Sequence, residues 1–341
     1  MLGSAVASTY AEALPLLLCD HTVDALITLF VPPVVAGADE VASAIVRAVE
    51  NTGNTEKPVL ACVISADGTP AQLLSGAVAP FSFPESAARA LGRAAERTEW
   101  LRRPQGRTPM FSDIDRRAAR RLVDDNPEGW LDPDLTRQLL SAYGLPLVSE
   151  CPVATVEEAV MAADQIGYPV VVKTAQAGVH KTESGSVAID LRDSNAVRAA
   201  ARRIGAPLLI QPMVRSGVEV LVGAVQDPVF GPLIALGPGG TLAELIGDAA
   251  FRLTPLTDYD AQELVRTGKA GRLLAGFRGA APADGEALED LLLRVSQLAE
   301  DLPELAELDL NPVFAGPSGC VIVDARVRMG LAQPRETLKT W

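Results

Sequence analysis

The segment at residues 178–185, with the sequence GVHKTESG, places His180 and Lys181 side by side between glycines. The chain contains only two histidines and five lysines, and Lys173 ends the apolar run GYPVVVKTA seven positions before His180. An ammonium group at the end of a buried strand can present a compact charge to a phosphate, and glycines permit close backbone approach. The alternatives are a lysine that reaches solvent from its strand end and a histidine with no role beyond its loop.

Two segments near the end of the chain, ELDLNP at 307–312 and VDAR at 323–326, carry candidate metal ligands. We expect both to be strands of a hairpin that turns at AGPSG. Asp309 and Asn311 are two residues apart and project from one strand face, which Asp324 can share from the return strand. A few protein oxygens, completed by water and phosphate, suit Mg²⁺. A buried ladder of polar side chains explains the same spacing.

A third group, GPGGTLAELIGD at 237–248, places Gly239 and Gly240 before residues with helical spacing. Free N–H groups at the start of a helix can bind a phosphate. A turn that only starts the helix also accounts for these glycines. No Walker A sequence is present and no G-x-G-x-x-G follows a strand, so a phosphate site has to be built from these three groups.

The first hundred residues alternate strand and helix patterns. Apolar, β-branched runs at 23–33 and 57–65 predict buried strands, and helical spacing follows each of them, at 39–52 and 83–100. This order predicts a parallel α/β sheet, of which only half is present. The earlier run ALPLLLCD predicts a buried helix, because no Lys or Arg precedes it and it is too short to span a bilayer.

The remaining chain has a different pattern of residues. Residues 101–130 are rich in Pro, Gly and charge and predict a linker, interrupted by the basic helix DIDRRAARRLVDD. We expect its arginines to form a solvated or interdomain face. From residue 131, helices at 134–144, 155–167 and 285–301 accompany a strand-rich series with few other helices. That mixture predicts an α+β domain on antiparallel sheets.

The composition limits the class of protein. A length of 341 residues suggests two or three compact units, and 48% hydrophobic residues suffice for their cores. The net charge of −13 argues against binding to nucleic acid or to an anionic membrane. The four cysteines lie far apart without metal or redox spacing, which favours a reducing, cytoplasmic location.

The three chemical groups, in this order, resemble the ATP-grasp portion of the ADP-forming acyl-CoA synthetases, or acetate–CoA ligases. The resemblance covers about residues 131 to 330 and runs through LLSAYGLP, IGYPVVVKTAQAGVHKTESG, GVEVLVGAVQDPVFGPLIALGPGG and AELDLNPV. The first hundred residues resemble the end of the flavodoxin-like module that precedes this portion in single-chain members. The resemblance implies a partial flavodoxin-like module at 1–100, a linker at 101–130 and an ATP-grasp domain at 131–335.

The family also implies roles for individual residues. Lys173 would contact the nucleotide phosphates, as would Gly239 and Gly240, while Asn311 and Asp324 would hold Mg²⁺. Asp309 would lie at the site of phosphoryl transfer.

The resemblance also implies where the adenine base binds and which residue carries the phosphoryl group. The strand LLIQPMV would pass the adenine, contacting it largely through backbone groups near Gln211 and Met213. His180 would carry a phosphoryl group on a swinging loop, with Lys181 supplying charge.

The chain departs from the family in places. It has SGS at 184–186 where two consecutive glycines are usual, and it lacks the CoA-binding domain and the module region with a second relay histidine. His21 matches nothing in the family, and we expect it to be structural.

The expected protein is an oligomeric, Mg²⁺-dependent ligase component that binds ATP or ADP, in acid + CoA + ATP ⇌ acyl-CoA + ADP + phosphate. A partner chain would carry the CoA-binding and phosphohistidine domains. Two alternatives stay open. One is a non-catalytic or regulatory nucleotide-binding module derived from a truncated synthetase. The other is a carboxylate–amine ligase of the ATP-grasp type, against which the His-Lys loop argues.

Overall fold

The computed structural model describes residues 5–32, 37–53, 56–65, 68–176, 185–214, 217–240 and 247–330. The chain divides into two compact units, Met1–Arg103 and Pro104–Trp341, and each has a hydrophobic core of its own. None of the helices in the described ranges is long and apolar enough to cross a membrane. All four cysteines are free thiols.

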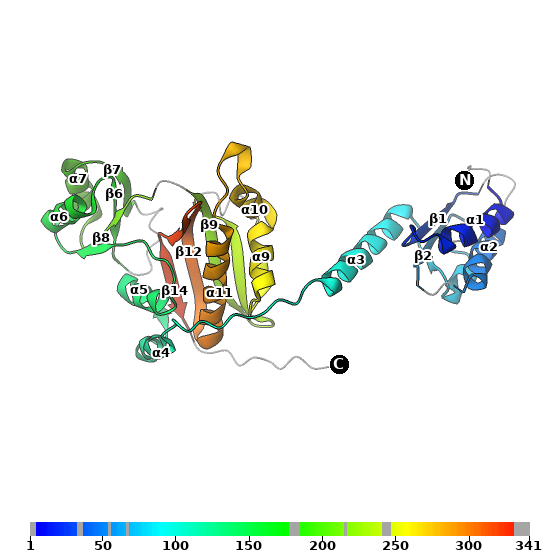
Figure 1. Cartoon of the computed structure of the whole chain (residues 1–341), viewed down its shortest axis with the longest axis horizontal. Helices are drawn as coiled ribbons and strands as arrows, with labels where there is room; N and C mark the ends of the chain where they lie inside the picture. The colour runs from blue at the N-terminus through cyan, green and yellow to red at the C-terminus, as the bar shows by residue number, and fades with distance from the viewer. Residues whose placement is uncertain are drawn as a thin grey trace. The chain divides into compact units, whose positions relative to one another are not determined.

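The first unit is a parallel sheet of three strands in the order β1–β2–β3, as the alternating pattern predicts. Helices α1 and α2 cover one face and α3 covers the other (Figure 1). All five residues of β2 are buried, which is typical of a central parallel strand. The elements are α1 (Ala7–Cys19), β1 (Leu26–Phe30), α2 (Ala38–Asn51), β2 (Val59–Val63), η1 (Ala71–Ser75), β3 (Ala79–Pro80) and α3 (Pro84–Arg102).

The second unit contains two antiparallel sheets. The smaller has four strands in the order β5–β8–β6–β7, and α6 and α7 cover one of its faces. Helix α6 starts with a capping box between Thr155 and Glu158, which satisfies N–H groups of its first turn. The elements are β5 (Cys151–Val153), α6 (Val156–Ile166), β6 (Val170–Thr174), β7 (Val187–Leu191), α7 (Ser194–Ile204) and β8 (Leu208–Pro212).

The larger sheet has seven strands, with the path β11–β10–β9–β12–β14–β4 and β13 paired to β12. Helices α9, α10 and α11 lie on one of its faces (Figure 1). The strands are β4 (Gly129–Trp130), β9 (Val218–Asp227), β10 (Gly231–Pro238), β11 (Ala250–Leu253), β12 (Leu305–Gly316), β13 (Gly319–Ile322) and β14 (Ala325–Met329). The helices of this part are α4 (Arg116–Asp125), α5 (Pro133–Ala142), α9 (Asp258–Arg266), α10 (Gly268–Leu274), η3 (Phe277–Gly279) and α11 (Gly285–Asp301).

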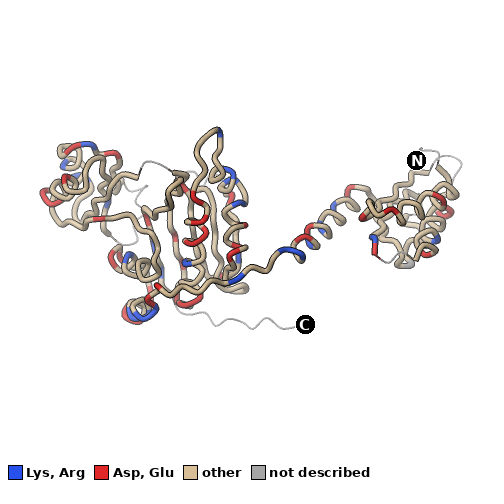
Figure 2. Tube along the Cα trace, viewed as in Figure 1, with Lys and Arg blue, Asp and Glu red and all other residues tan. Residues whose placement is uncertain are grey.

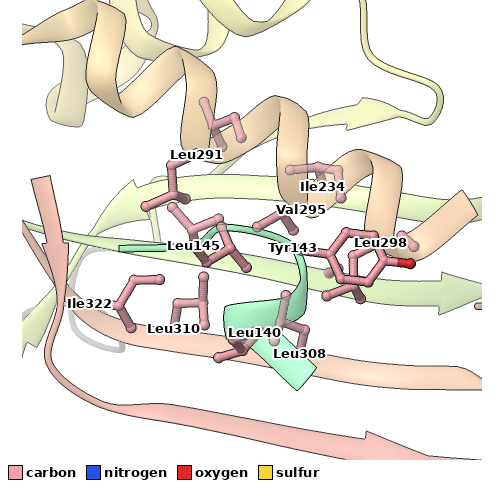
Figure 3. Close-up of a cluster of buried hydrophobic side chains, with 14 of the residues drawn as sticks. Leu140, Tyr143, Leu145, Ile234, Leu291, Val295, Leu298, Leu308, Leu310 and Ile322 are labelled. Atoms are coloured by element: carbon pink, nitrogen blue, oxygen red, sulfur yellow. The ribbon is translucent and has the colours of Figure 1, made fainter. Parts of the chain in front are cut away.

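The main core lies between the larger sheet and α11 (Figure 3). Leu308 and Leu310 of β12 are buried there against the helix residues Leu291, Val295 and Leu298. Because side chains alternate along a strand, Asp309 projects from the opposite face of the sheet. The core therefore fixes the strand that carries the predicted polar site.

The basic helix expected from DIDRRAARRLVDD begins at Arg116, with Asp115 as its N-cap. Figure 2 shows its arginines beside acidic residues. Arg116 pairs with Asp301 at 2.7 Å, and Arg120 forms two hydrogen bonds of 3.0 Å to Glu304. These contacts hold α4 to its own unit.

The expectation of few helices between 167 and 285 was incomplete, because α7, α9 and α10 lie in this range. These helices have 11, 9 and 7 residues, so each offers only two or three turns of apolar periodicity. Such short patterns are easily lost among neighbouring strands. Start signals were present for α7 and α9, in the caps Asp193 and Thr257.

Candidate functional site

Lys173 links the two sheets of the second unit. It lies on β6, where all five residues are buried, and only 5% of its surface is exposed. Its Nζ donates to the backbone oxygen of Val323 and to Oδ1 of Asp324, each at 3.1 Å. A buried ammonium group requires such partners, because its desolvation is otherwise costly. Lys173 therefore does not reach solvent from its strand end.

The hairpin expected at the end of the chain is present, but its return strand is broken. We expected one strand through 323–326, whereas β13 ends at Ile322 and β14 begins at Ala325. The physical reason is that the backbone at Val323 turns its carbonyl to Lys173 instead of to a ladder partner. The residue opposite, Pro312, has no N–H to donate to the ladder. Asp324 thus lies at a gap in the sheet.

Gln211 approaches the same gap from β8. It is 1% exposed, and its Nε2 donates to Oε2 of Glu150 at 2.6 Å and to the Val323 oxygen at 3.4 Å. A carboxylate accepts only, so Glu150 fixes which end of the amide faces it. Within the described ranges, Oε1 of Gln211 is then left buried without a hydrogen-bond partner. An orphaned acceptor of this kind fits a ligand that donates a hydrogen bond.

Glu150 is held in place from its other side. Arg137 on α5 donates from Nε to Oε1 of Glu150 at 3.0 Å and from Nη2 to the Val148 oxygen at 2.7 Å. Neither Arg137 nor Glu150 lies in a motif that marks a site in the sequence. The available signal was a single acidic residue between the apolar stretch LPLV and β5.

Asn311 anchors the glycine-rich segment. Its Oδ1 accepts a hydrogen bond from the Gly240 N–H at 3.0 Å, and its own N–H donates to the Asp324 oxygen at 3.1 Å. Gly240 has φ = +67°, and a Cβ at Gly239 would lie 2.5 Å from the backbone of Val220. Both positions therefore require glycine. The helical segment expected after them, at 241–246, lies outside the described residues.

Asp309 lies near the centre of the larger sheet. In the strand register it is opposite Gly223 on β9 and Arg326 on β14. The guanidinium of Arg326 stacks on the Trp130 ring at 4.3 Å. Asp309 is half-buried, on the face that does not contact α11.

The structure thus brings together some of the predicted site residues. Lys173, Gln211 and Asp324 meet around the Val323 carbonyl, and Asn311 joins Gly240 to the Asp324 backbone. Met213 follows β8, and its N–H is already bonded to the Pro169 oxygen at 3.0 Å. His180 and Lys181 lie outside the described residues.

The oxygen donors at this junction suit a magnesium ion that takes most of its ligands from outside the protein. Among the described residues, no group of three His, Cys, Asp or Glu side chains could bind a metal. Asp324 provides a carboxylate, and the Asn311 oxygen, which accepts from Gly240, retains a second lone pair. Mg²⁺ commonly takes one or two protein oxygens and completes its shell with phosphate and water.

The cavity at this junction is small. Its volume is about 30 Å³, room for no more than a few water molecules. Its lining includes Lys173, Gln211, Asp324 and Glu150. A ligand much larger than water can enter this cavity only if these side chains separate.

The nearby cysteine does not offer a nucleophile. Cys320 on β13 has its Sγ 3.3 Å from the Ala287 oxygen. Burial raises the pKa of this thiol to about 11, so it is protonated at neutral pH.

Comparison with known proteins identifies this arrangement. The family model of the ATP-grasp domain matches residues 123–329, and the chain belongs to that family. A relative from Pyrococcus furiosus, the beta subunit of acetate–CoA ligase [ADP-forming] I, is 39% identical over 204 residues, covering 56% of this chain and 88% of that subunit. The chain is accordingly a member of the ADP-forming acetate–CoA ligase family, as its motifs indicated.

A longer relative matches both units. Acetate–CoA ligase [ADP-forming] I of Archaeoglobus fulgidus is 32% identical over 349 residues, covering 97% of this chain and 49% of the relative. The chain therefore spans about half the length of this relative.

A solved structure is also similar. The dinucleotide forming acetyl-coenzyme A synthetase 1 of Ca. Korarchaeum cryptofilum is 38% identical, with a TM-score of 0.55, and the match covers 63% of this chain and 100% of that chain. That protein was solved with coenzyme A and Mg-AMPPCP, and its phosphohistidine segment points towards the nucleotide binding site.

Proposed function

We propose that this chain is the Mg²⁺-dependent, ATP- or ADP-binding component of an ADP-forming acyl-CoA synthetase. The observation that carries the proposal is the meeting of Lys173, Gln211 and Asp324 at the gap between β13 and β14. The cation Lys173 matches the phosphates of a magnesium nucleotide, the orphaned acceptor of Gln211 matches its base, and the carboxylate of Asp324 matches its metal. Family membership supports the same assignment.

Each residue then has a defined task. Lys173 neutralises phosphate charge, while Asp324 and Asn311 hold Mg²⁺. The N–H groups of Gly239 and Gly240 contribute to phosphate binding, and Oε1 of Gln211 accepts a hydrogen bond from the base. Catalysis of this kind depends on positioning and on charge neutralisation around the transferred phosphoryl group.

Nucleotide binding opens the Lys173–Asp324 ion pair. In the structure, Lys173 is paired with the carboxylate of Asp324, which the metal needs as a ligand. The volume of the cavity is about 30 Å³. With a nucleotide bound, Lys173 would pair with its phosphates, and Asp324 would be free to hold the metal ion. The exchange leaves no buried charge unpaired.

The phosphoryl group passes to His180. An imidazole nitrogen attacks the γ-phosphorus of ATP, a nitrogen–phosphorus bond forms, and the bond to the β-phosphate oxygen breaks to release ADP. Lys181 steadies the phosphohistidine, and Asp309 lies near the transfer. The related Korarchaeum protein, with its phosphohistidine segment towards the nucleotide, supports this role. A partner chain supplies the acyl-CoA half of the reaction, in line with the beta-subunit relative.

Labelling tests the proposal. Incubation of the chain and its partner with γ-labelled Mg-ATP should give an acid-labile, alkali-stable label, which His180→Ala abolishes. His21→Ala is the matched control and should change nothing, because the His21 side chain is 96% exposed. Absence of label with the partner present would contradict a phosphoryl carrier and leave a non-catalytic nucleotide-binding module.

A further inference from the structure

The outer edge of β1 in the first unit has no neighbouring strand among the described residues. β1 pairs with β2 alone, and the Ile64 N–H donates to the Phe30 oxygen at 2.9 Å. In a parallel ladder, alternate residues turn both of their backbone groups towards the same neighbour. The N–H groups of Ile27 and Leu29 therefore point away from β2, towards an edge where the described part of the chain supplies no acceptor.

The side chains around this edge are apolar and exposed. Leu29 is 50% exposed and Val31 65%, and Leu17 on the neighbouring helix α1 is 40% exposed. A groove of about 370 Å³ opens between α1 and β1. Parallel sheets are normally covered on both faces, and natural proteins protect long, flat, apolar edges. Within the described residues no strand pairs with β1 along this groove, which makes it a candidate docking surface.

The opposite edge of this sheet is different. It is formed by β3, which has only two residues. A short edge strand has few free backbone groups with which another chain could pair. One outward carbonyl of β1 is already protected, because the Tyr10 hydroxyl donates to the Leu29 oxygen at 2.7 Å. An added strand would replace this hydroxyl with a backbone N–H.

The comparisons indicate what covers the edge. The beta-subunit match is 204 residues long, and the family model begins at residue 123, beyond the first unit. The Archaeoglobus relative matches 97% of the chain, so it includes the first unit, yet about half of that relative has no counterpart here. In the longer relative, the matched region that includes the first unit is thus joined to a further half that lies outside the match.

We infer that the outer edge of β1 binds a parallel β-strand from a partner chain that carries this other half. The added strand would accept hydrogen bonds from the Ile27 and Leu29 N–H groups and lay apolar side chains against Leu29 and Val31. A parallel orientation continues the β1–β2–β3 sheet. The identity of the partner rests on the proposed function, whereas the edge itself does not.

Photocrosslinking in the source cells tests the inference. The full chain carries a benzoyl-phenylalanine in place of Val31 or, as a matched control, in place of the exposed Arg89 on α3. We expect position 31 to crosslink to a polypeptide that resembles the half of the relative without a counterpart here. The yield should exceed that of position 89 at least about tenfold, because an added strand holds the two chains in register. Crosslinks to a second copy of this chain, or equal yields at both positions, would overturn the inference.

Variants of Leu29 make the test specific. Leu29→Pro removes an N–H that the β1–β2 ladder does not use, so the sheet should persist while strand addition fails. Its crosslinking from position 31 should fall about tenfold, with Leu29→Val unaffected. Leu29→Lys is the second blocking variant if the proline unfolds the unit, as circular dichroism would reveal. Crosslinking that survives both blocking variants would overturn strand addition.

The same samples separate this inference from the proposed function. Binding of Mg-ADP to the second unit should be unchanged in every Leu29 variant. Failure of the unsubstituted chain to bind Mg-ADP would count against the nucleotide site alone, and loss of the crosslink would count against the edge alone.

Discussion

The two faces of β12 serve different purposes. Leu308 and Leu310 are 1% and 0% exposed and lie under α11, whereas Asp309 and Asn311 are half-buried on the open face. Asn311 is bonded to Gly240 and to the backbone of Asp324. Because side chains alternate with a period of two, one strand carries both sets. Stability and ligand binding should therefore separate between neighbouring residues of this strand.

The largest expected effect is on the covered face. Leu310→Ala should lower the free energy of unfolding of the second unit by about 2–5 kcal/mol, since it leaves a cavity under α11. Asn311→Ala, the matched change on the next residue, should cost about 1 kcal/mol, for its hydrogen bond to Gly240. Urea denaturation followed by circular dichroism measures both. Equal losses would show that the two faces are not separable.

The buried ion pair should show the intermediate effect. Asp324→Ala removes the carboxylate beside Lys173 and should destabilise the second unit by about 1–3 kcal/mol, since a buried ammonium loses a partner. Lys173→Met keeps a similar volume but leaves the Asp324 carboxylate without its partner; because that carboxylate is 24% exposed and can be hydrated, the variant should lose less stability than Asp324→Ala, yet weaken nucleotide binding. Thermal unfolding and nucleotide titration distinguish these outcomes. A strongly destabilised Lys173→Met would make this pair structural instead of ligand-binding.

The smallest effect concerns a pair at the rim of the covered face. Hydrogen bonds from Arg120 hold the pKa of Glu304 below its ordinary value. A lowered folded-state pKa contributes stability above the unfolded-state pKa of about 4.3, and that stability is lost as the pH falls through the folded value. Glu304→Gln should thus cost about 0.5–1 kcal/mol at neutral pH.

The pH dependence is the specific part of this prediction. The difference between Glu304→Gln and the unsubstituted chain should fade as the pH falls below about 4. Glu307→Gln is the control, because its pair with Arg328 is more exposed, at 41% and 44% of the side chains. A Glu304 difference that grows in acid would have the wrong sign for this pairing.

The sequence predicted most of the elements whose patterns are long. The parallel sheet of the first unit, the buried strand with Lys173 and helix α11 all follow from apolar periodicity. The helices α7, α9 and α10 were not expected, because only two or three turns carry their pattern.

The site was predictable as residues but not as contacts. Lys173 and Asp324 are 151 residues apart in sequence, and Gln211 and Glu150 are 61 apart. Motif order identified three of these four residues, but it contained nothing about which side chains pair. The break at Val323 likewise depends on a lysine from another sheet, which no local pattern around that residue could reveal.

The most direct test of the account is calorimetry of ADP binding with and without Mg²⁺. Mg²⁺ should increase the affinity of the unsubstituted chain at least about tenfold, because phosphate and Asp324 oxygens share the metal. Asp324→Asn keeps an oxygen for Lys173 and should preserve the fold while losing this increase. Glu307→Gln, on the same face of the sheet, should retain it. Equal affinity with and without Mg²⁺ in all three proteins would contradict a metal–nucleotide site at the gap between β13 and β14.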